Sequence, residues 1–177
     1  MRMILAAAVA LTPQLVFAAG SDDTAPPTPT ETTTECAKGE VWDEKTKACI
    51  KAEEQSLNDD QRFGAVRELA YAGRPDEALA ILATMTEGET ARVLTYQGFL
   101  LRQTGKIEEG IAAYERAIAL DEANHLARSY YGQLLVQMDA LPEARLQLAA
   151  IRMSGGGGTW AEQSLAAAID TGITYTY

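Results

Sequence analysis

The sequence has little of the material from which catalytic and metal sites are built. Its 177 residues include one histidine, His125, and two cysteines, Cys36 and Cys49. A zinc site takes several cysteine and histidine ligands, and histidine is the most frequent general acid or base. The chain therefore has too few of these residues for a His/Cys zinc site or for catalysis that depends on histidine. We expect a protein that is not an enzyme and that holds neither a metal nor a cofactor.

Positive charge and aromatic side chains are also scarce. Lysine and arginine number 15 against 25 acidic residues, and the formal net charge is −10. An excess of negative charge disfavours binding to nucleic acid or to an anionic membrane surface. Aromatic residues make up only 7% of the chain while alanine is abundant, which favours closely packed helices over a β-sandwich.

No apolar run is long enough to cross a bilayer, which takes about 20 residues. The longest, residues 4–11, follows a basic start and precedes Val16, Phe17 and Ala18, a sequence that a signal peptidase accepts. We expect a signal peptide at residues 1–18, cleavage between Ala18 and Ala19, and no stable membrane insertion afterwards. The short apolar core and the alanine-rich cleavage site are of the bacterial type, which predicts a periplasmic or secreted protein.

A linker follows the signal peptide. Residues 19–35 are rich in threonine and proline and contain no large apolar side chain. Such a segment buries too little surface to offset the entropy of ordering it. The composition therefore predicts a disordered linker.

The two cysteines bracket the next segment, residues 36–50. In an exported protein a pair at this spacing is typical of a disulfide, so we expect Cys36 and Cys49 to be bonded. Two short strands around a polar turn at residues 43–47 predict a β-hairpin. We expect this hairpin to stand apart from the rest of the protein, so that breaking the disulfide leaves the thermal unfolding of the helical part nearly unchanged.

From residue 58 onwards a helical pattern repeats about every 34 residues. Gly98 and Gly132 lie at this spacing. A small residue is followed four positions later by a large one in each repeat, which lets two helices approach closely and fills the gap one turn on. These pairs are Ala78 with Leu82, Gly110 with Tyr114, and Ala144 with Leu148.

The repeat resembles the tetratricopeptide repeat (TPR) family. The unit at residues 91–124 is the most similar, with Gly98 at the close-packing glycine of the first helix, Gly105 at the turn, and Tyr114 and Ala117 in the second helix. The resemblance extends to the flanking units at residues 59–90 and 125–158. It implies a stack of helix-turn-helix units over residues 58–154.

A further helix is predicted after the glycines at 155–158. Thr159 and Glu162 form a capping-box pattern, and we expect a capping helix at residues 159–171, followed by a tail at 172–177. The predicted fold class is therefore all-α: an α-solenoid of about three TPR-like units with a C-terminal capping helix, preceded by a small disulfide-stapled β-hairpin.

The resemblance also implies a binding surface, because in this family the first helices of successive units line a concave groove that takes a peptide or a helix. Carried over by position, the groove residues are Phe63, Arg67, Tyr71, Arg92, Thr95, Phe99, Arg102, Ser129, Gln133 and Gln137. Arginines hold carboxylates and aromatics act as anchors, so this set predicts a preference for acidic segments or a free carboxy terminus.

Two functions follow from these patterns. The first is an exported, non-enzymatic interaction module that binds a protein or peptide partner in the groove. The alternative is a protein that binds a cell-envelope polymer such as a glycan through the hairpin, with the repeats as a spacer or dimerisation unit. In the alternative Trp42 would be an exposed anchor, whereas otherwise it simply covers the disulfide.

Overall fold

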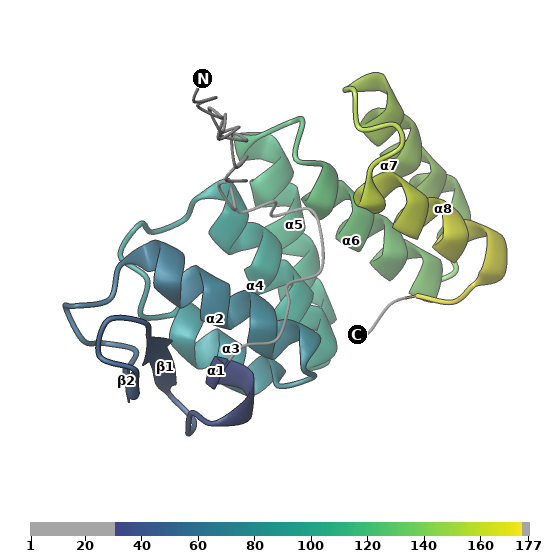
Figure 1. Ribbon diagram of the computed structural model, residues 1–177. Coiled ribbons are helices and arrows are strands. Elements are labelled where there is room, and N and C mark those ends of the chain that lie inside the picture. Colours follow the sequence, from purple (N-terminus) through teal and green to yellow (C-terminus); the bar gives the residue numbers. More distant parts are fainter. Residues whose placement is uncertain (1–30, 175–177) are drawn as a thin grey trace, which may run out of the picture.

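The computed structural model describes residues 31–174. The predicted signal peptide, its cleavage at Ala18 and Ala19, and most of the predicted linker lie outside the described residues. The described chain is mostly helical with a two-stranded antiparallel hairpin (Figure 1). Its elements are α1 (Glu31–Thr34), β1 (Glu40–Asp43), β2 (Ala48–Lys51), α2 (Asp59–Tyr71), α3 (Pro75–Leu82), α4 (Ala91–Gln103), α5 (Ile107–Leu120), α6 (His125–Gln137), α7 (Leu141–Met153) and α8 (Trp160–Thr171).

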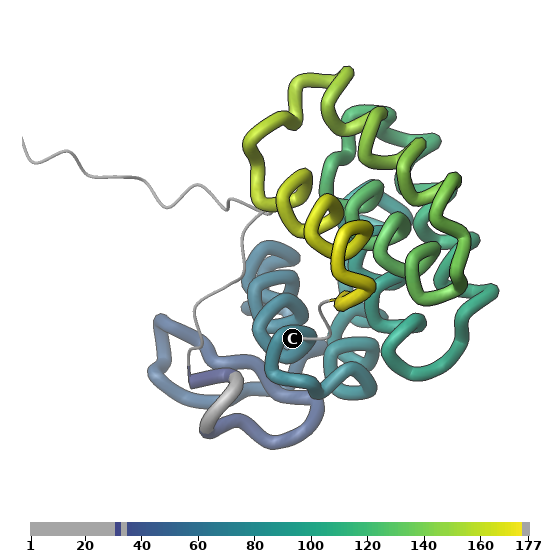
Figure 2. Tube along the Cα trace, turned by 90° about the vertical axis from the view of Figure 1, so that its right-hand side faces the viewer, coloured from purple at the N-terminus to yellow at the C-terminus, as the bar shows by residue number. Residues whose placement is uncertain are grey.

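From α2 onwards the helices pack as consecutive pairs. Helix α2 packs on α3, α4 on α5, and α6 on α7, whereas α8 packs on both α6 and α7. In Figure 2 the yellow helix α8 lies near the middle of the view, with the blue α2 to its left and the light-green α7 to its right. Within residues 31–174 no helix has both the length and the apolar character needed to cross a bilayer.

The first helix of each pair, and α8 after them, begins at a polar side chain. This N-cap side chain accepts a hydrogen bond from a backbone N–H of the first turn, which stabilises the helix end. The caps are Asn58, Thr90, Asn124 and Thr159. They are spaced by 32, 34 and 35 residues, so α8 begins where a fourth unit would begin.

The second helices begin differently. Each follows a residue in the left-handed region of backbone conformation, with φ of 70° at Gly73, 81° at Gly105 and 59° at Asp139. Glycine adopts this conformation without steric cost, and aspartate tolerates it better than most residues. The turn between the two helices of a unit therefore has the same geometry in all three pairs.

Glycine also sets how closely paired helices approach. A Cβ atom added to Gly98 of α4 would lie 2.7 Å from the ring of Tyr114 and 3.0 Å from the carbonyl oxygen of Gly110, both on α5. In α6 a Cβ on Gly132 would lie 2.6 Å from Leu165 of α8. The small residues of the repeat thus lie where two helices touch.

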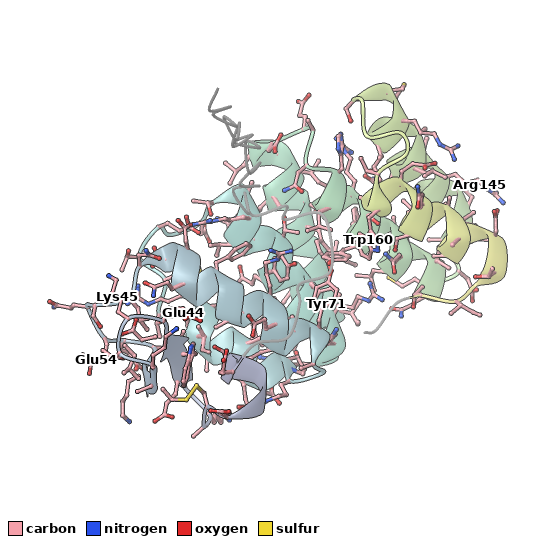
Figure 3. All side chains as sticks on the ribbon, in the orientation of Figure 1. Glu44, Lys45, Glu54, Tyr71, Arg145 and Trp160 are labelled. Carbon is pink, nitrogen blue, oxygen red and sulfur yellow. A yellow bond between two sulfur atoms is a disulfide. The ribbon has the colours of Figure 1, made fainter. Side chains whose placement is uncertain are left out.

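An aromatic core joins the pairs. Tyr130 of α6 stands between Tyr71 of α2, whose hydroxyl lies 2.5 Å from its own, and Trp160 of α8, at 6.1 Å between ring centroids. Both neighbours are labelled in Figure 3. Tyr130 also packs against Phe99 of α4 at 4.6 Å between centroids. Side chains far apart in the sequence therefore meet in one core.

The last residues of the predicted linker are ordered. Residues Glu31–Thr34 form α1, and the buried Thr32 accepts a hydrogen bond at its hydroxyl from the backbone N–H of Trp42, at 3.1 Å. The prediction of disorder is therefore wrong for this turn, because the hairpin supplies the polar partner that an isolated linker lacks.

The disulfide between Cys36 and Cys49 is confirmed, and it appears as the yellow bond in Figure 3. The expectation that the hairpin stands apart is wrong. Val41 of β1 is only 1% exposed and belongs to the same hydrophobic cluster as Phe63 and Val66 of α2. A two-stranded hairpin is marginal alone, and this one gains stability by burying its apolar face against α2.

Because the hairpin packs on α2, we now expect that breaking the disulfide destabilises the helical part, contrary to the prediction from the sequence. Cys36→Ser should lower the free energy of unfolding of the whole described fold by about 2–4 kcal/mol, since the crosslink restrains the segment that covers α2. Denaturant unfolding followed by far-ultraviolet circular dichroism measures this loss. The Cys36→Ser/Cys49→Ser protein serves as the control, because reductant should destabilise the wild type but not this variant. An unchanged unfolding midpoint in Cys36→Ser would contradict the docking of the hairpin.

Candidate functional site

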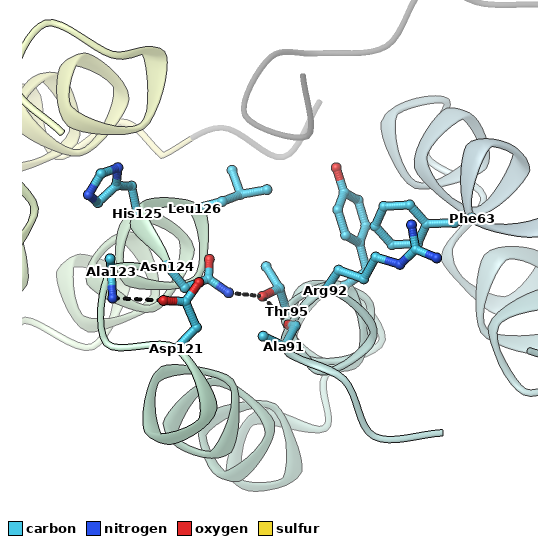
Figure 4. A pocket seen from close by; sticks show the side chains of 10 residues that line it. Phe63, Ala91, Arg92, Thr95, Asp121, Ala123, Asn124, His125 and Leu126 are labelled. Atoms are coloured by element: carbon cyan, nitrogen blue, oxygen red, sulfur yellow. Dashed lines mark hydrogen bonds between the residues drawn. The ribbon is translucent and has the colours of Figure 1, made fainter. Parts of the chain in front are cut away.

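A pocket of about 320 Å³ lies between the N-terminal ends of α4 and α6, beside α2 (Figure 4). Volumes from about 300 Å³ upwards are typical of ligand pockets. The pocket is lined by Phe63, Ala91, Arg92, Thr95, Tyr96, Asp121, Ala123, Asn124, His125 and Leu126. Three successive first helices, with the turn before α6, therefore contribute to one concave site.

Asn124 and Thr95 form a rigid polar wall in this pocket. The Asn124 side chain accepts a hydrogen bond from the backbone N–H of Ala127 at 2.9 Å, which caps α6, and donates to the hydroxyl of Thr95 at 3.0 Å. That hydroxyl in turn donates to the carbonyl of Ala91 at 2.7 Å. One cap thus starts α6 and links it to α4, and its side-chain oxygen and nitrogen each have a hydrogen-bond partner within the protein.

Arg92 forms another wall, and its charge is already engaged. The guanidinium lies 4.9 Å from the ring centroid of Phe63, a cation–π distance. It donates to both carboxylate oxygens of Glu87, at 2.7 and 2.9 Å, and to Asp60 at 2.7 Å. Hydrogen bonding to Glu87, and then to Asp60, holds the pKa of Arg92 above its ordinary value. Arg92 therefore stays charged and is held in place by two carboxylates.

His125 and Tyr96 are two further titratable residues that line the pocket. The Nε2 atom of His125 lies 3.0 Å from the hydroxyl of Ser154, and a Cβ on Gly156 would lie 2.8 Å from the imidazole. Burial raises the pKa of Tyr96, so its phenol stays neutral. No group of three metal-ligating side chains occurs among residues 31–174.

The ten predicted groove residues divide by exposure. Gln137 is exposed, Tyr71 and Arg92 are partly buried, and the other seven are buried. The structure brings Phe63, Arg92 and Thr95 together in the pocket. The buried set is Phe63, Arg67, Thr95, Phe99, Arg102, Ser129 and Gln133.

Two of the predicted arginines do not face an open groove, and this part of the prediction is wrong. Arg67 is 9% exposed and donates to the hydroxyl of Tyr96 at 3.2 Å. Arg102 is 7% exposed and donates to the carbonyl of Tyr130 at 3.3 Å. The first helices lie so close together that aromatic side chains reach across them and bury these positions.

The position-by-position transfer missed the pocket residues that precede or begin α6. Asp121, Ala123, Asn124 and His125 lie in the turn before α6 or at its start, outside the helix interior from which groove positions are carried over. One signal could have indicated them, since Asn124 follows the cap Thr90 by one repeat length. Equivalent caps place the starts of neighbouring first helices side by side.

The hairpin offers less to a glycan than the alternative function requires. Trp42 is half-buried and pairs across the ladder with Cys49, and cross-strand neighbours share a face of the sheet. Its indole Nε1 is buried and has no hydrogen-bond partner among the described residues. This placement favours the interpretation that Trp42 covers the disulfide.

The chain was compared with family models, curated proteins and solved structures. No family model, curated protein or solved structure gives a significant match to the chain.

Proposed function

We propose that the protein is an exported, non-enzymatic interaction module of the TPR type that binds a peptide or protein segment where its first helices meet. The recurrence of helix caps at Asn58, Thr90 and Asn124, 32 and 34 residues apart, supports three stacked units. The close approach at Gly98 supports the family's mode of helix pairing. In this α-solenoid α8 is the capping helix.

The observation that carries the proposal is the pocket itself. Phe63, Arg92 and Leu126 come from three successive first helices and line one cavity. A segment lying across these helices would contact all three units at once. The Asn124 and Thr95 side chains are hydrogen-bonded within the protein and Arg92 is paired with carboxylates, which suits the site to binding rather than to proton transfer.

The disulfide supports export. Disulfides persist in oxidising compartments and are rare in the cytosol, and the bond between Cys36 and Cys49 lies against the main core. Together with the signal-peptide pattern in the sequence, it favours the periplasm or the extracellular space.

Site-specific photocrosslinking tests the binding site in cells. A photoreactive amino acid at Ala123, which lines the pocket, should give a discrete adduct whose digest maps to one segment of one partner. The matched control places it at Leu146 of α7, which is 68% exposed and does not line the pocket. Absence of an adduct at Ala123, or identical adducts from both positions, would refute the proposed binding face.

A further inference from the structure

The predicted groove arginines imply a positively charged surface, but the surroundings of the pocket are negatively charged. Arg92 is the guanidinium in the lining, and two carboxylates, Glu87 and Asp60, are bonded to it. On the opposite edge Asp121 is exposed and lines the pocket. Arg128 does not line the pocket, and its side chain donates to the Glu122 backbone carbonyl and to Gln147 of α7.

These groups leave an excess of negative charge at the pocket mouth. Asp60 and Glu87 are both bonded to Arg92, and Asp121 lines the pocket, so three carboxylates surround one guanidinium group and leave two net negative charges at neutral pH. Glu89, which precedes α4, does not change this net charge because it is paired with Arg116. An acidic segment would therefore meet repulsion here, and it would have to compete with Glu87 for Arg92.

The interior of the pocket selects for an apolar group. Phe63, Tyr96 and Leu126 supply large apolar walls, and Ala91 and Ala123 leave room between them. The polar atoms of the Asn124 and Thr95 wall already bond within the protein, so none of them requires a ligand atom. Burying a polar group without a new partner costs free energy, whereas burying an apolar one is favourable.

Resting on the proposed function, we infer that the pocket takes one large apolar side chain of a partner segment whose neighbouring residues are lysine or arginine. The apolar side chain enters between α4 and α6. The basic neighbours lie against Asp60 on one edge and against Asp121 on the other. Opposite charges of this kind speed encounter and select partners, and the net charge of −10 acts in the same direction.

Three matched synthetic peptides test this specificity on the oxidised protein, with the bond between Cys36 and Cys49 intact. The first has a central phenylalanine flanked by two lysines on each side, the second replaces the lysines by glutamates, and the third replaces the phenylalanine by alanine. Fluorescence anisotropy at low salt should show the first binding at least about tenfold more tightly than either of the others. Raising the salt concentration should weaken it, since the charges at the mouth are exposed.

Paired variants separate recognition at this site from general attraction to an acidic protein. Asp121→Asn and Asp170→Asn each remove one negative charge, and both aspartates are exposed, but only Asp121 lines the pocket. Asn keeps an oxygen that can accept from the Ala123 N–H, as Asp121 does at 3.0 Å. Asp121→Asn should weaken the lysine–phenylalanine peptide several-fold more than Asp170→Asn does. Ala123→Trp, which fills the pocket, should abolish the phenylalanine preference.

The outcomes distinguish this inference from the proposed function. Equal effects of the two asparagine variants, or equal binding of the phenylalanine and alanine peptides, would overturn the inference. So would a segment captured at Ala123 in cells that proved acidic or lacked a large apolar residue, although the binding face would then stand. Absence of any captured segment at Ala123 would instead refute the proposed function.

Discussion

Replacing Arg62 by methionine should lower the free energy of unfolding by about 3 kcal/mol or more, the range found when a buried charged network is broken. Arg62 is only 5% exposed, although it lies in the first turn of α2. Its guanidinium donates to the carbonyls of Ala52, Leu57 and Glu54 at 2.7–3.0 Å, and to the carboxylate of Asp59 at 3.0 Å. Removing it leaves these acceptors without their donor in the segment that joins the hairpin to α2.

Denaturant unfolding measures the loss, and Arg152→Met is the matched control. Arg152 also donates to a carboxylate, that of Glu162, but its side chain is 57% exposed. Exposed ion pairs contribute about 0–1 kcal/mol, so this variant should remain close to the wild type. If both variants lost the same small amount, Arg62 would be a solvated side chain and the hairpin would not be anchored through it.

The features that were predicted from the sequence depend on local signals. The disulfide follows from the spacing of Cys36 and Cys49, and the helix pairs follow from caps and turns that recur every 32–35 residues. A cap or a left-handed turn is determined within a few residues of chain. The turn before the second helix has glycine in the first two units, Gly73 and Gly105, and aspartate in the third. Asp139 still adopts the left-handed conformation because its short side chain tolerates it.

The features that were missed depend on contacts between distant segments. Nothing near Arg67 in the sequence indicates that Tyr96 accepts its hydrogen bond, and nothing near Val41 indicates that α2 covers it. The direction of each first helix relative to the next decides which positions of the groove remain open. That direction is set by side-chain packing between units, so the helix starts form a pocket while the helix interiors are closed.

Gly98→Ala should destabilise the protein by about 2 kcal/mol, as overpacking of a tight core does. The new Cβ would lie 2.7 Å from two ring carbons of Tyr114 and 3.0 Å from the backbone oxygen of Gly110. The ring is fully buried and the backbone oxygen belongs to α5, so α4 and α5 would have to separate. Thermal and denaturant unfolding measure the loss.

Gly64→Ala is the control, and it should have the opposite sign. Gly64 lies in the interior of α2 with no atom within 4 Å of an added Cβ, so alanine should stabilise the helix by about 0.5–1 kcal/mol through the lower entropy of the unfolded chain. Combining Gly98→Ala with Tyr114→Leu should cost less than the sum of the two single variants, because the ring that the Cβ meets is gone. A stabilising Gly98→Ala, or a strictly additive double variant, would show that the close approach of α4 and α5 does not explain this glycine.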